Sequence, residues 1–160
     1  MTKRYMTVEG QTAIQAEIDF LWSKERPEIV NQVTAAAELG DRSENAEYIY
    51  GKKRLREIDS RLRYLQKKID GVTVVELSSM PTHKDVRFGA IVTVEDDDGQ
   101  RTFRLVDQDE SDPSRRRISI QSPIGRALLG KKVGDQVEVE LPKDRISLEI
   151  VEIRYGGGEP

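Results

Sequence analysis

The stretch AAAELGDRSENAEY, residues 35–48, decides the fold, because it forms a turn between two long segments of helical period. In the segment before the turn, apolar residues recur at steps of four and three, as Ile14, Ile18 and Leu21 and then as Ile29, Val33 and Ala36. In the segment after it, the same steps continue without a break through Tyr48, Gly51, Leu55, Ile58, Leu62, Leu65 and Ile69. This spacing is typical of a coiled coil, and the short connection predicts an antiparallel hairpin.

Four residues give local predictions for the hairpin: where the first helix begins, bends and ends, and where the seam is loosely packed. Thr7 is a suitable N-cap for the first helix, and Gly40 suits the C′ position that ends it. Pro27 falls between the two apolar sets and is expected to kink or re-phase the first helix, because it lacks a backbone donor. Gly51 has no side chain to pack, so we expect it to loosen the seam near the turn.

From about Val72 the apolar period changes to two, which predicts short strands. The strand candidates are VTVVEL, AIVTVED, TFRLVD, RISI, DQVEVEL and ISLEIVEI. One helix is predicted in SPIGRALLGK, with Ser122 as cap and Pro123 in the first position. The sequence thus predicts an α+β protein, with a hairpin over residues 1–75, a linker or ordered loop over 76–84 and a small, mostly antiparallel sheet domain over 85–160. Residues 156–160 are expected to fray.

Composition narrows the class of protein. The chain has 160 residues, a formal net charge of -3 and no cysteine, so neither a disulfide framework nor thiolate metal ligation is expected. No apolar run approaches the ~20 residues that span a bilayer, and the first residues, MTKRYMTVEG, lack the apolar core of a secretory signal. We therefore expect a cytoplasmic protein without a membrane partner. The oligomeric state is left open by the sequence, and a monomer is the working expectation.

Four acids, Glu38, Asp41, Glu44 and Glu47, recur every third residue around the turn. One interpretation is a capping box, in which Asp41 accepts amide protons and Glu44 reaches back. A cap needs only one or two acids, however, and Glu38 lies in the last turn of the first helix, where the helix dipole disfavours an anion. The charge therefore favours a target outside the chain.

A divalent cation is the alternative to the cap. Mg²⁺ prefers oxygen ligands and is often held by one or two carboxylates together with water and phosphate. Asp41 and Glu44 are three residues apart and can converge on one ion. A convex hairpin tip offers no cleft, so a partner would have to supply the rest of the site.

The run from Lys52 to Lys68 holds eight basic residues against only Glu57 and Asp59. It can be the solvated face of a coiled coil, or it can contact the phosphates of a nucleic acid. The imbalance of charge and the position beside the turn favour the nucleic acid.

Three segments, LGDRSENAEY, KKRLREIDSRLRYLQKKI and ISIQSPIGRALLGKKVGDQVEVELP, resemble the bacterial Gre transcript-cleavage factors, the second of them the GreB subtype in particular. The resemblance covers nearly the whole chain in the same order. It implies a coiled coil that enters the secondary channel of RNA polymerase and an FKBP-like carboxy-terminal domain that docks at the channel rim.

The resemblance also implies roles for single residues. Asp41 and Glu44 would help to hold the second Mg²⁺ of the polymerase active centre, and Ser43 would add a hydroxyl contact. The basic run would contact the extruded 3′ segment of the nascent RNA, through Lys52, Lys53, Arg54, Arg56 and Arg61. The polymerase itself would cut the RNA, so the chain would be an accessory factor that binds no Mg²⁺ alone.

Two rival functions remain open at this stage. A regulator could occupy the same channel and inhibit the polymerase without stimulating cleavage. An FKBP-like sheet also makes prolyl isomerase activity a rival function. An isomerase pocket needs several aromatic side chains, however, and the carboxy-terminal half of the chain offers only Phe88, Phe103 and Tyr155.

Other conspicuous residues receive local interpretations. Tyr48 belongs to the seam, whereas Tyr50 is a candidate for stacking on a base. Trp22 is expected to pack against its own helix or the second domain. His83 and the group Arg115–Arg117 are expected at the surface in solvent.

Overall fold

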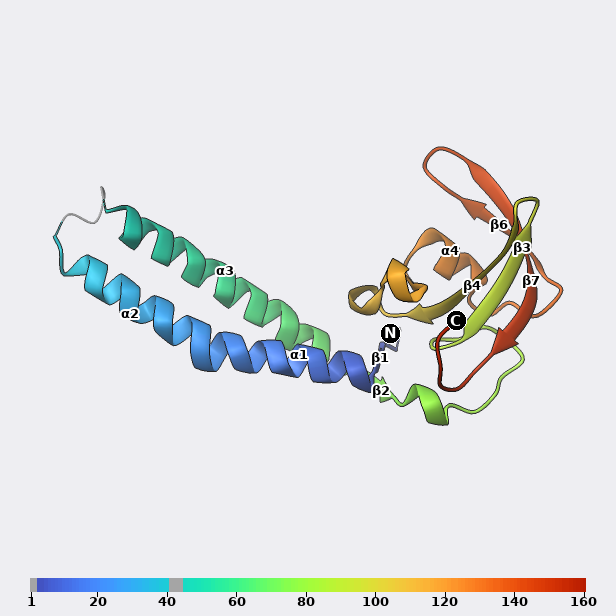
Figure 1. Ribbon diagram of the computed structural model, residues 1–160, viewed down its shortest axis with the longest axis horizontal. Coiled ribbons are helices and arrows are strands. Elements are labelled where there is room, and N and C mark those ends of the chain that lie inside the picture. Colours follow the sequence, from blue (N-terminus) through green and yellow to red (C-terminus); the bar gives the residue numbers. More distant parts are fainter. Residues whose placement is uncertain (1–2, 41–44) are drawn as a thin grey trace. The chain divides into compact units, whose positions relative to one another are not determined.

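The computed structural model describes residues 3–40 and 45–160 (Figure 1). It confirms the α+β class, with a long helical hairpin and a sheet domain. Two compact units are present: Gln11–Val72 is one, and the residues up to Gly10 join Thr73–Pro160 in the other. This division differs at the start of the chain from the expected hairpin over residues 1–75. The reason is that strand β1 (Tyr5–Thr7) pairs in parallel with β2 (Thr73–Val75).

The first arm of the hairpin consists of α1 (Val8–Phe20), a π-helical turn (Leu21–Glu25) and α2 (Arg26–Ala37). Thr7 caps α1 as predicted, since its hydroxyl accepts the amide proton of Gly10 at 3.0 Å. Pro27 lies in the first turn of α2. The predicted re-phasing is confirmed: the wide turn absorbs an extra residue, so the buried face passes from Leu21 to Ile29.

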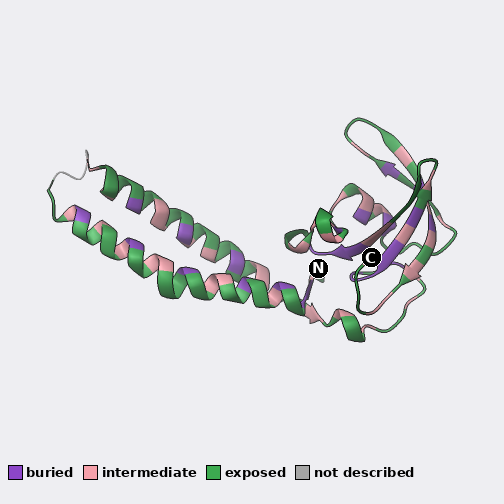
Figure 2. Cartoon of the chain, viewed as in Figure 1, coloured by how far each residue is buried: buried purple, intermediate pink, exposed green. Residues whose placement is uncertain are grey.

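The second arm is the single helix α3 (Ala46–Ile69), and it lies beside α2 (Figure 1). Gly51, Ile58 and Leu65 are its buried residues, and the other seam positions are half-buried (Figure 2). The predicted seam is therefore confirmed.

The expectation that Gly51 loosens the seam is wrong. A Cβ atom at this position would lie 2.4 Å from Cγ2 of Val33, which is far inside van der Waals contact. Gly51 therefore allows a close approach of α3 to α2.

The described sheet domain has five strands in the order β5-β4-β3-β7-β6. They are β3 (Ile91–Asp96), β4 (Gly99–Val106), β5 (Arg117–Ser119), β6 (Gln136–Glu140) and β7 (Arg145–Arg154). The sheet is mixed, because β5 pairs with β4 in parallel while the other pairs are antiparallel. Its core is aliphatic and includes the fully buried Val92, Leu105, Leu128, Leu148 and Ile150.

Short helical pieces complete this unit. Helix α4 (Pro123–Leu128) begins as predicted, with the Ser122 hydroxyl accepting from the Gly125 amide at 3.0 Å. Three 3-10 turns occupy Leu77–Ser79, Gln108–Glu110 and Pro113–Arg115. The segment 76–84 is an ordered loop, since the Leu77 and Met80 side chains pack over Gly89.

The prediction that residues 156–160 fray is wrong. The buried Arg104 guanidinium donates to the carbonyl oxygens of Gly156 at 2.9 Å and Gly158 at 2.7 Å. No helix within residues 3–40 and 45–160 is both long enough and apolar enough to cross a membrane.

Candidate functional site

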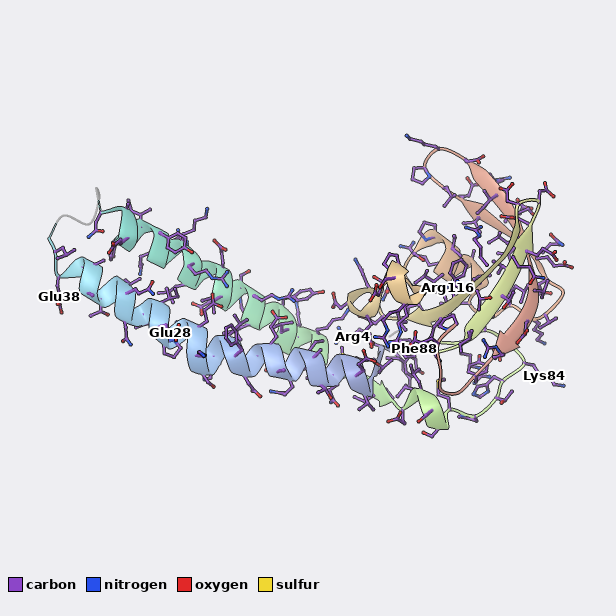
Figure 3. All side chains as sticks on the ribbon, viewed as in Figure 1. Arg4, Glu28, Glu38, Lys84, Phe88 and Arg116 are labelled. Carbon is purple, nitrogen blue, oxygen red and sulfur yellow. The ribbon has the colours of Figure 1, made fainter. Side chains whose placement is uncertain are left out.

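Asp41, Ser43 and Glu44, the predicted catalytic and metal-binding residues, lie outside the described residues. The two flanking acids are described. Glu38 is the exposed C-cap of α2, at the end of that helix which leads into the turn (Figure 3), and Glu47 is exposed in the first turn of α3.

Asn45 joins the two helices at the turn. Its side-chain oxygen accepts the amide proton of Tyr48 at 3.1 Å, which makes Asn45 the N-cap of α3. Its side-chain nitrogen donates to the carbonyl oxygen of Ala36 at 2.8 Å, which satisfies one of the last carbonyls of α2.

The capping-box interpretation of the turn is therefore wrong in one respect. It requires a helix that begins next to Asp41, whereas α3 begins at Ala46. Sequence analysis missed Asn45, although asparagine is a favoured N-cap residue, because the pair Asp41 and Glu44 gave a more complete capping pattern.

Within the described ranges, no group of three or more His, Asp or Glu side chains is arranged to hold a metal ion. Asp41 and Glu44 lie outside these ranges, so the predicted Mg²⁺ ligands stay a prediction.

Two of the five predicted RNA contacts are engaged inside the hairpin. The Nε atom of Arg54 donates to Glu25 at 2.6 Å, and the Nε atom of Arg61 donates to Glu17 at 2.6 Å. The Glu25 carboxylate raises the pKa of the Arg54 guanidinium. These two arginines therefore tie α3 to the first arm.

A third pair, Arg26 with Asp59 at 2.9 Å, also joins the arms, but here the arginine belongs to the first arm and the acid to α3. Its hydrogen bond holds the pKa of the Asp59 carboxyl below the ordinary value. Both acids of the Lys52–Lys68 run are thus occupied, because Glu57 pairs with Arg54 at 3.4 Å.

The remaining predicted contacts, Lys52, Lys53 and Arg56, are exposed and form no ion pair with a described residue. Arg63 is exposed as well, and its charge contributes to the lowered pKa of the Asp59 carboxyl. Lys52, Arg56 and Arg63 are spaced four and seven residues apart, which places them in one stripe along the helix. The basic run thus divides into cations that bind the hairpin together and cations that remain available.

The three tyrosines of α3 differ in how far they are buried and in whether another side chain contacts the ring. Tyr48 is half-buried, as its seam position predicts. Tyr64 is 45% exposed and has the Arg61 guanidinium 5.3 Å from its ring centroid. Tyr50 is 63% exposed, and its side chain has neither a hydrogen bond nor a ring contact with a described residue.

Trp22 was expected to pack against its own helix or the second domain, and the described contact lies within its own arm. Its side chain is 62% exposed in the π-helical turn, and the Arg26 guanidinium lies 5.7 Å from the ring centroid.

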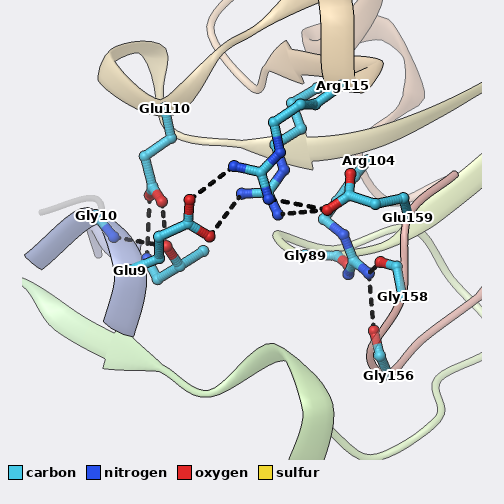
Figure 4. Close-up of polar contacts among 11 residues, drawn as sticks. Glu9, Gly10, Gly89, Arg104, Glu110, Arg115, Gly156, Gly158 and Glu159 are labelled. Atoms are coloured by element: carbon cyan, nitrogen blue, oxygen red, sulfur yellow. Dashed lines mark hydrogen bonds and ion pairs between the residues drawn. The ribbon is translucent and has the colours of Figure 1, made fainter. Parts of the chain in front are cut away.

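A charged cluster ties the first turn of α1 to the sheet unit (Figure 4). Arg115 donates to Glu9 at 2.7 Å and to Glu159 at 2.9 Å, and Arg117 lies 3.3 Å from Glu159. Arg117 is only 5% exposed. The prediction that Arg115–Arg117 are solvated is therefore wrong for Arg115 and Arg117.

A second contact fixes the same helix end. The Glu110 carboxylate accepts from the Thr7 amide at 3.0 Å and from the Thr7 hydroxyl (Figure 4). Glu110 also occupies the space that a side chain at Gly10 would need, since an added Cβ would lie 2.5 Å from its Cδ.

The aromatic side chains of the sheet unit do not point to an isomerase pocket. Phe88 is buried and stacks on Tyr5, and Phe103 lies beside the Arg101 guanidinium. Tyr155 donates to the carbonyl oxygen of Asp85 and makes an edge contact with His83, which is half-buried. Each of the three has a separate structural partner.

Comparison with known proteins decides the family. The model "Transcription elongation factor, N-terminal" matches residues 4–74, and the model "Transcription elongation factor, GreA/GreB, C-term" matches residues 81–155. The chain belongs to the GreA/GreB family of transcription elongation factors. The second match covers the sheet strands β3 to β7, and the first covers both arms of the hairpin.

Two GreB elongation factors agree with this assignment. The GreB elongation factor of Yersinia pestis is 51% identical over 152 residues, which is 94% of this chain and 88% of that protein. The GreB factor of Pseudomonas putida is 48% identical over 159 residues, with 99% and 98% of the two chains covered. A crystal structure of the GreA factor homolog 1 protein of Thermus thermophilus is 21% identical, covers 96% and 99% of the two chains, and has a TM-score of 0.44.

Proposed function

We propose that this elongation factor inserts its hairpin into the secondary channel of RNA polymerase and stimulates Mg²⁺-dependent endonucleolytic cleavage of backtracked nascent RNA. Cleavage leaves a new RNA 3′ end in the active centre and so rescues an arrested complex. The polymerase performs the hydrolysis, and this chain acts as an accessory factor that contributes ligands through Asp41 and Glu44.

The proposal is supported chiefly by Asn45, which is the N-cap of α3. Asn45 caps that helix through the Tyr48 amide, and its side-chain nitrogen donates to the carbonyl oxygen of Ala36, so the described N-cap of α3 is an asparagine and not an acid. Two further acids, Glu38 and Glu47, are exposed on either side of the turn. Because the described cap of α3 is Asn45, the concentration of acids at this turn is best explained by a ligand that another molecule brings.

The chemistry follows from two-metal catalysis. Two divalent ions about 4 Å apart generate the attacking hydroxide and stabilise the leaving oxygen. Mg²⁺ is commonly held by only one or two carboxylates and by phosphate oxygens. A pair of acids delivered from outside would therefore be enough to raise the occupancy of a weakly held second ion, and Ser43 would add a hydroxyl contact.

The free cations of α3 supply the RNA contact in this proposal. Lys52, Lys53 and Arg56 are exposed and available for phosphates, whereas Arg54 and Arg61 already pair with Glu25 and Glu17. We therefore assign the RNA contact to the first group and the stability of the hairpin to the second.

The test is cleavage of 3′-backtracked RNA in a stalled polymerase complex with Mg²⁺. We expect Asp41→Asn and Glu44→Gln each to lower the stimulated rate by at least about a hundredfold, because each removes a ligand charge in the transition state, with polymerase binding nearly unchanged. Glu47→Gln is the matched control, since it removes an exposed acid of the same turn without touching the pair.

Normal stimulation by both variants would contradict the proposed role of the pair. If the wild-type chain binds the polymerase but leaves the RNA uncut, or slows its intrinsic cleavage, the chain is an inhibitor that occupies the channel.

A further inference from the structure

Tyr50 is an open aromatic ring beside the free cations of α3. It is 63% exposed and has no ring contact with a described residue. Lys53 lies three residues further on, so the two side chains are neighbours on the helix surface, with Cβ atoms about 5–6 Å apart. Both lie within two turns of the start of α3 at Ala46.

Tyr64, on the same helix, differs from Tyr50 because a cation of the chain itself lies over its ring. The Arg61 guanidinium lies over its ring at 5.3 Å, and that guanidinium is itself fixed by Glu17. The arginine nearest to Tyr50 in the helix is Arg54, four residues on, and Glu25 and Glu57 hold it. The face of Tyr50 is therefore left for a ligand from outside.

The charges around Tyr50 indicate the class of that ligand. Lys52, Lys53 and Arg56 are exposed and form no ion pair with a described residue, while the acids Glu57 and Asp59 are paired with arginines. An aromatic ring beside uncompensated cations matches a single-stranded nucleic acid, because bases stack on the ring while the cations meet the phosphates.

We infer that Tyr50 stacks on a base of the extruded single-stranded RNA and that Lys53 contacts an adjoining phosphate. This inference rests on the proposed function and adds a residue that positions the RNA through its base. Since every base has a π-face, the contact tolerates any sequence but requires that a base be present.

The test combines a protein variant with an RNA that lacks one base. Cleavage rates are measured at saturating factor on backtracked RNA that carries an abasic nucleotide at each extruded position in turn. For wild type, we expect one position at which loss of the base slows cleavage about tenfold, the size of one stacking contact. Tyr50→Leu should be about tenfold slower than wild type on intact RNA and should lose nothing more at that position.

Two further variants serve as controls. Tyr50→Phe keeps the ring and should stay within about twofold of wild type. Tyr64→Leu should respond to abasic RNA as wild type does, because its ring is already covered by Arg61. A thermal unfolding profile of Tyr50→Leu that matches wild type excludes a folding defect as the cause.

The outcomes separate this inference from the proposed function. Wild-type rates for Tyr50→Leu, or an equal loss on intact and abasic RNA at every position, would overturn base stacking; the second result would assign Tyr50 to a protein contact. A wild-type chain that stimulates no cleavage on any RNA would instead overturn the proposed function, and base stacking along with it.

Discussion

At the scale of the residue, the missing side chain of Gly51 sets how closely the two arms of the hairpin approach. We predict that Gly51→Ala destabilises the hairpin, because the new Cβ would lie 2.4 Å from Cγ2 of Val33 and the valine rotamer is stiff in a helix. Overpacking costs about 1–3 kcal/mol, while alanine in place of glycine recovers about 1 kcal/mol of helix propensity. Thermal unfolding followed by circular dichroism should therefore show a lower Tm.

The double variant Gly51→Ala with Val33→Ala is the control for that prediction. It removes the atom that the new Cβ would meet, so its Tm should lie above that of Gly51→Ala. A Gly51→Ala protein as stable as wild type, or more so, would show that the arms can separate without cost.

Among the predictions for single residues, the two hydroxyl caps were confirmed and the role of Gly51 was wrong. Thr7 and Ser122 were found as caps because a hydroxyl residue precedes an apolar period in both cases. Gly51 was misread because a sequence shows which side chain is absent but not what lies opposite. Gly40 has a φ of 110°, as expected for a glycine after a helix, but it follows the C-cap Glu38 by two residues instead of one.

At the scale of the element, the carboxy-terminal tail is held by charges from a 3-10 turn and from strand β5, both far away in the sequence. Glu159 pairs with Arg115 and Arg117, and the hydrogen bond from Arg115 holds the pKa of the Glu159 carboxyl below its ordinary value. The same arginine lowers the pKa of Glu9 in the first turn of α1. One cluster thus fixes both the tail and the start of the first helix.

These lowered pKa values predict how stability depends on pH. A carboxyl with a lower pKa in the folded state stabilises the fold above its unfolded pKa, and that contribution is lost as the pH falls through the folded pKa. The stability of the sheet unit should therefore drop between roughly pH 5 and pH 3. Glu159→Gln should lower Tm at pH 7, and its difference from wild type should close as the pH falls through that range.

Glu138→Gln is the matched control for the pH prediction, because Glu138 is exposed on β6 and forms no ion pair with a described residue. Its Tm should follow the wild-type curve. A difference between Glu159→Gln and wild type that stays constant from pH 7 to pH 3 would show that the ion pairs do not stabilise the tail.

Elements with a clear period were predicted, and those fixed by distant contacts were not. The strands β3 to β7 and the seam of α3 follow from alternation and from heptad spacing. The parallel pairing of Tyr5–Thr7 with Thr73–Val75 joins ends of the hairpin segment that lie far apart in sequence, and three residues carry too little period to reveal it. The tail was misread because its glycines resemble a disordered end, while the side chain that orders it, Arg104, belongs to β4.

At the scale of the whole molecule, the chain joins a hairpin, whose own arginines and acids hold its arms together, to a sheet unit that also includes the start of α1. The resemblance in sequence and the two family models agree on a transcription elongation factor. The fold, the seam and the family could be predicted from sequence. The division of the basic run into paired and free cations could not, because it depends on which acids of the first arm face α3.

In the proposed function, Asp41 and Glu44 raise the occupancy of a weakly bound Mg²⁺ in another protein's active centre. The most direct test is the Mg²⁺ dependence of RNA cleavage in a backtracked polymerase complex, measured alone, with the wild-type factor and with Asp41→Asn. We expect wild type to lower the Mg²⁺ concentration for half-maximal cleavage by about tenfold or more. Asp41→Asn should bind the polymerase but leave that concentration at the value of polymerase alone. A half-maximal concentration that the wild-type factor does not change, or that Asp41→Asn lowers equally well, would contradict this role of the acid pair.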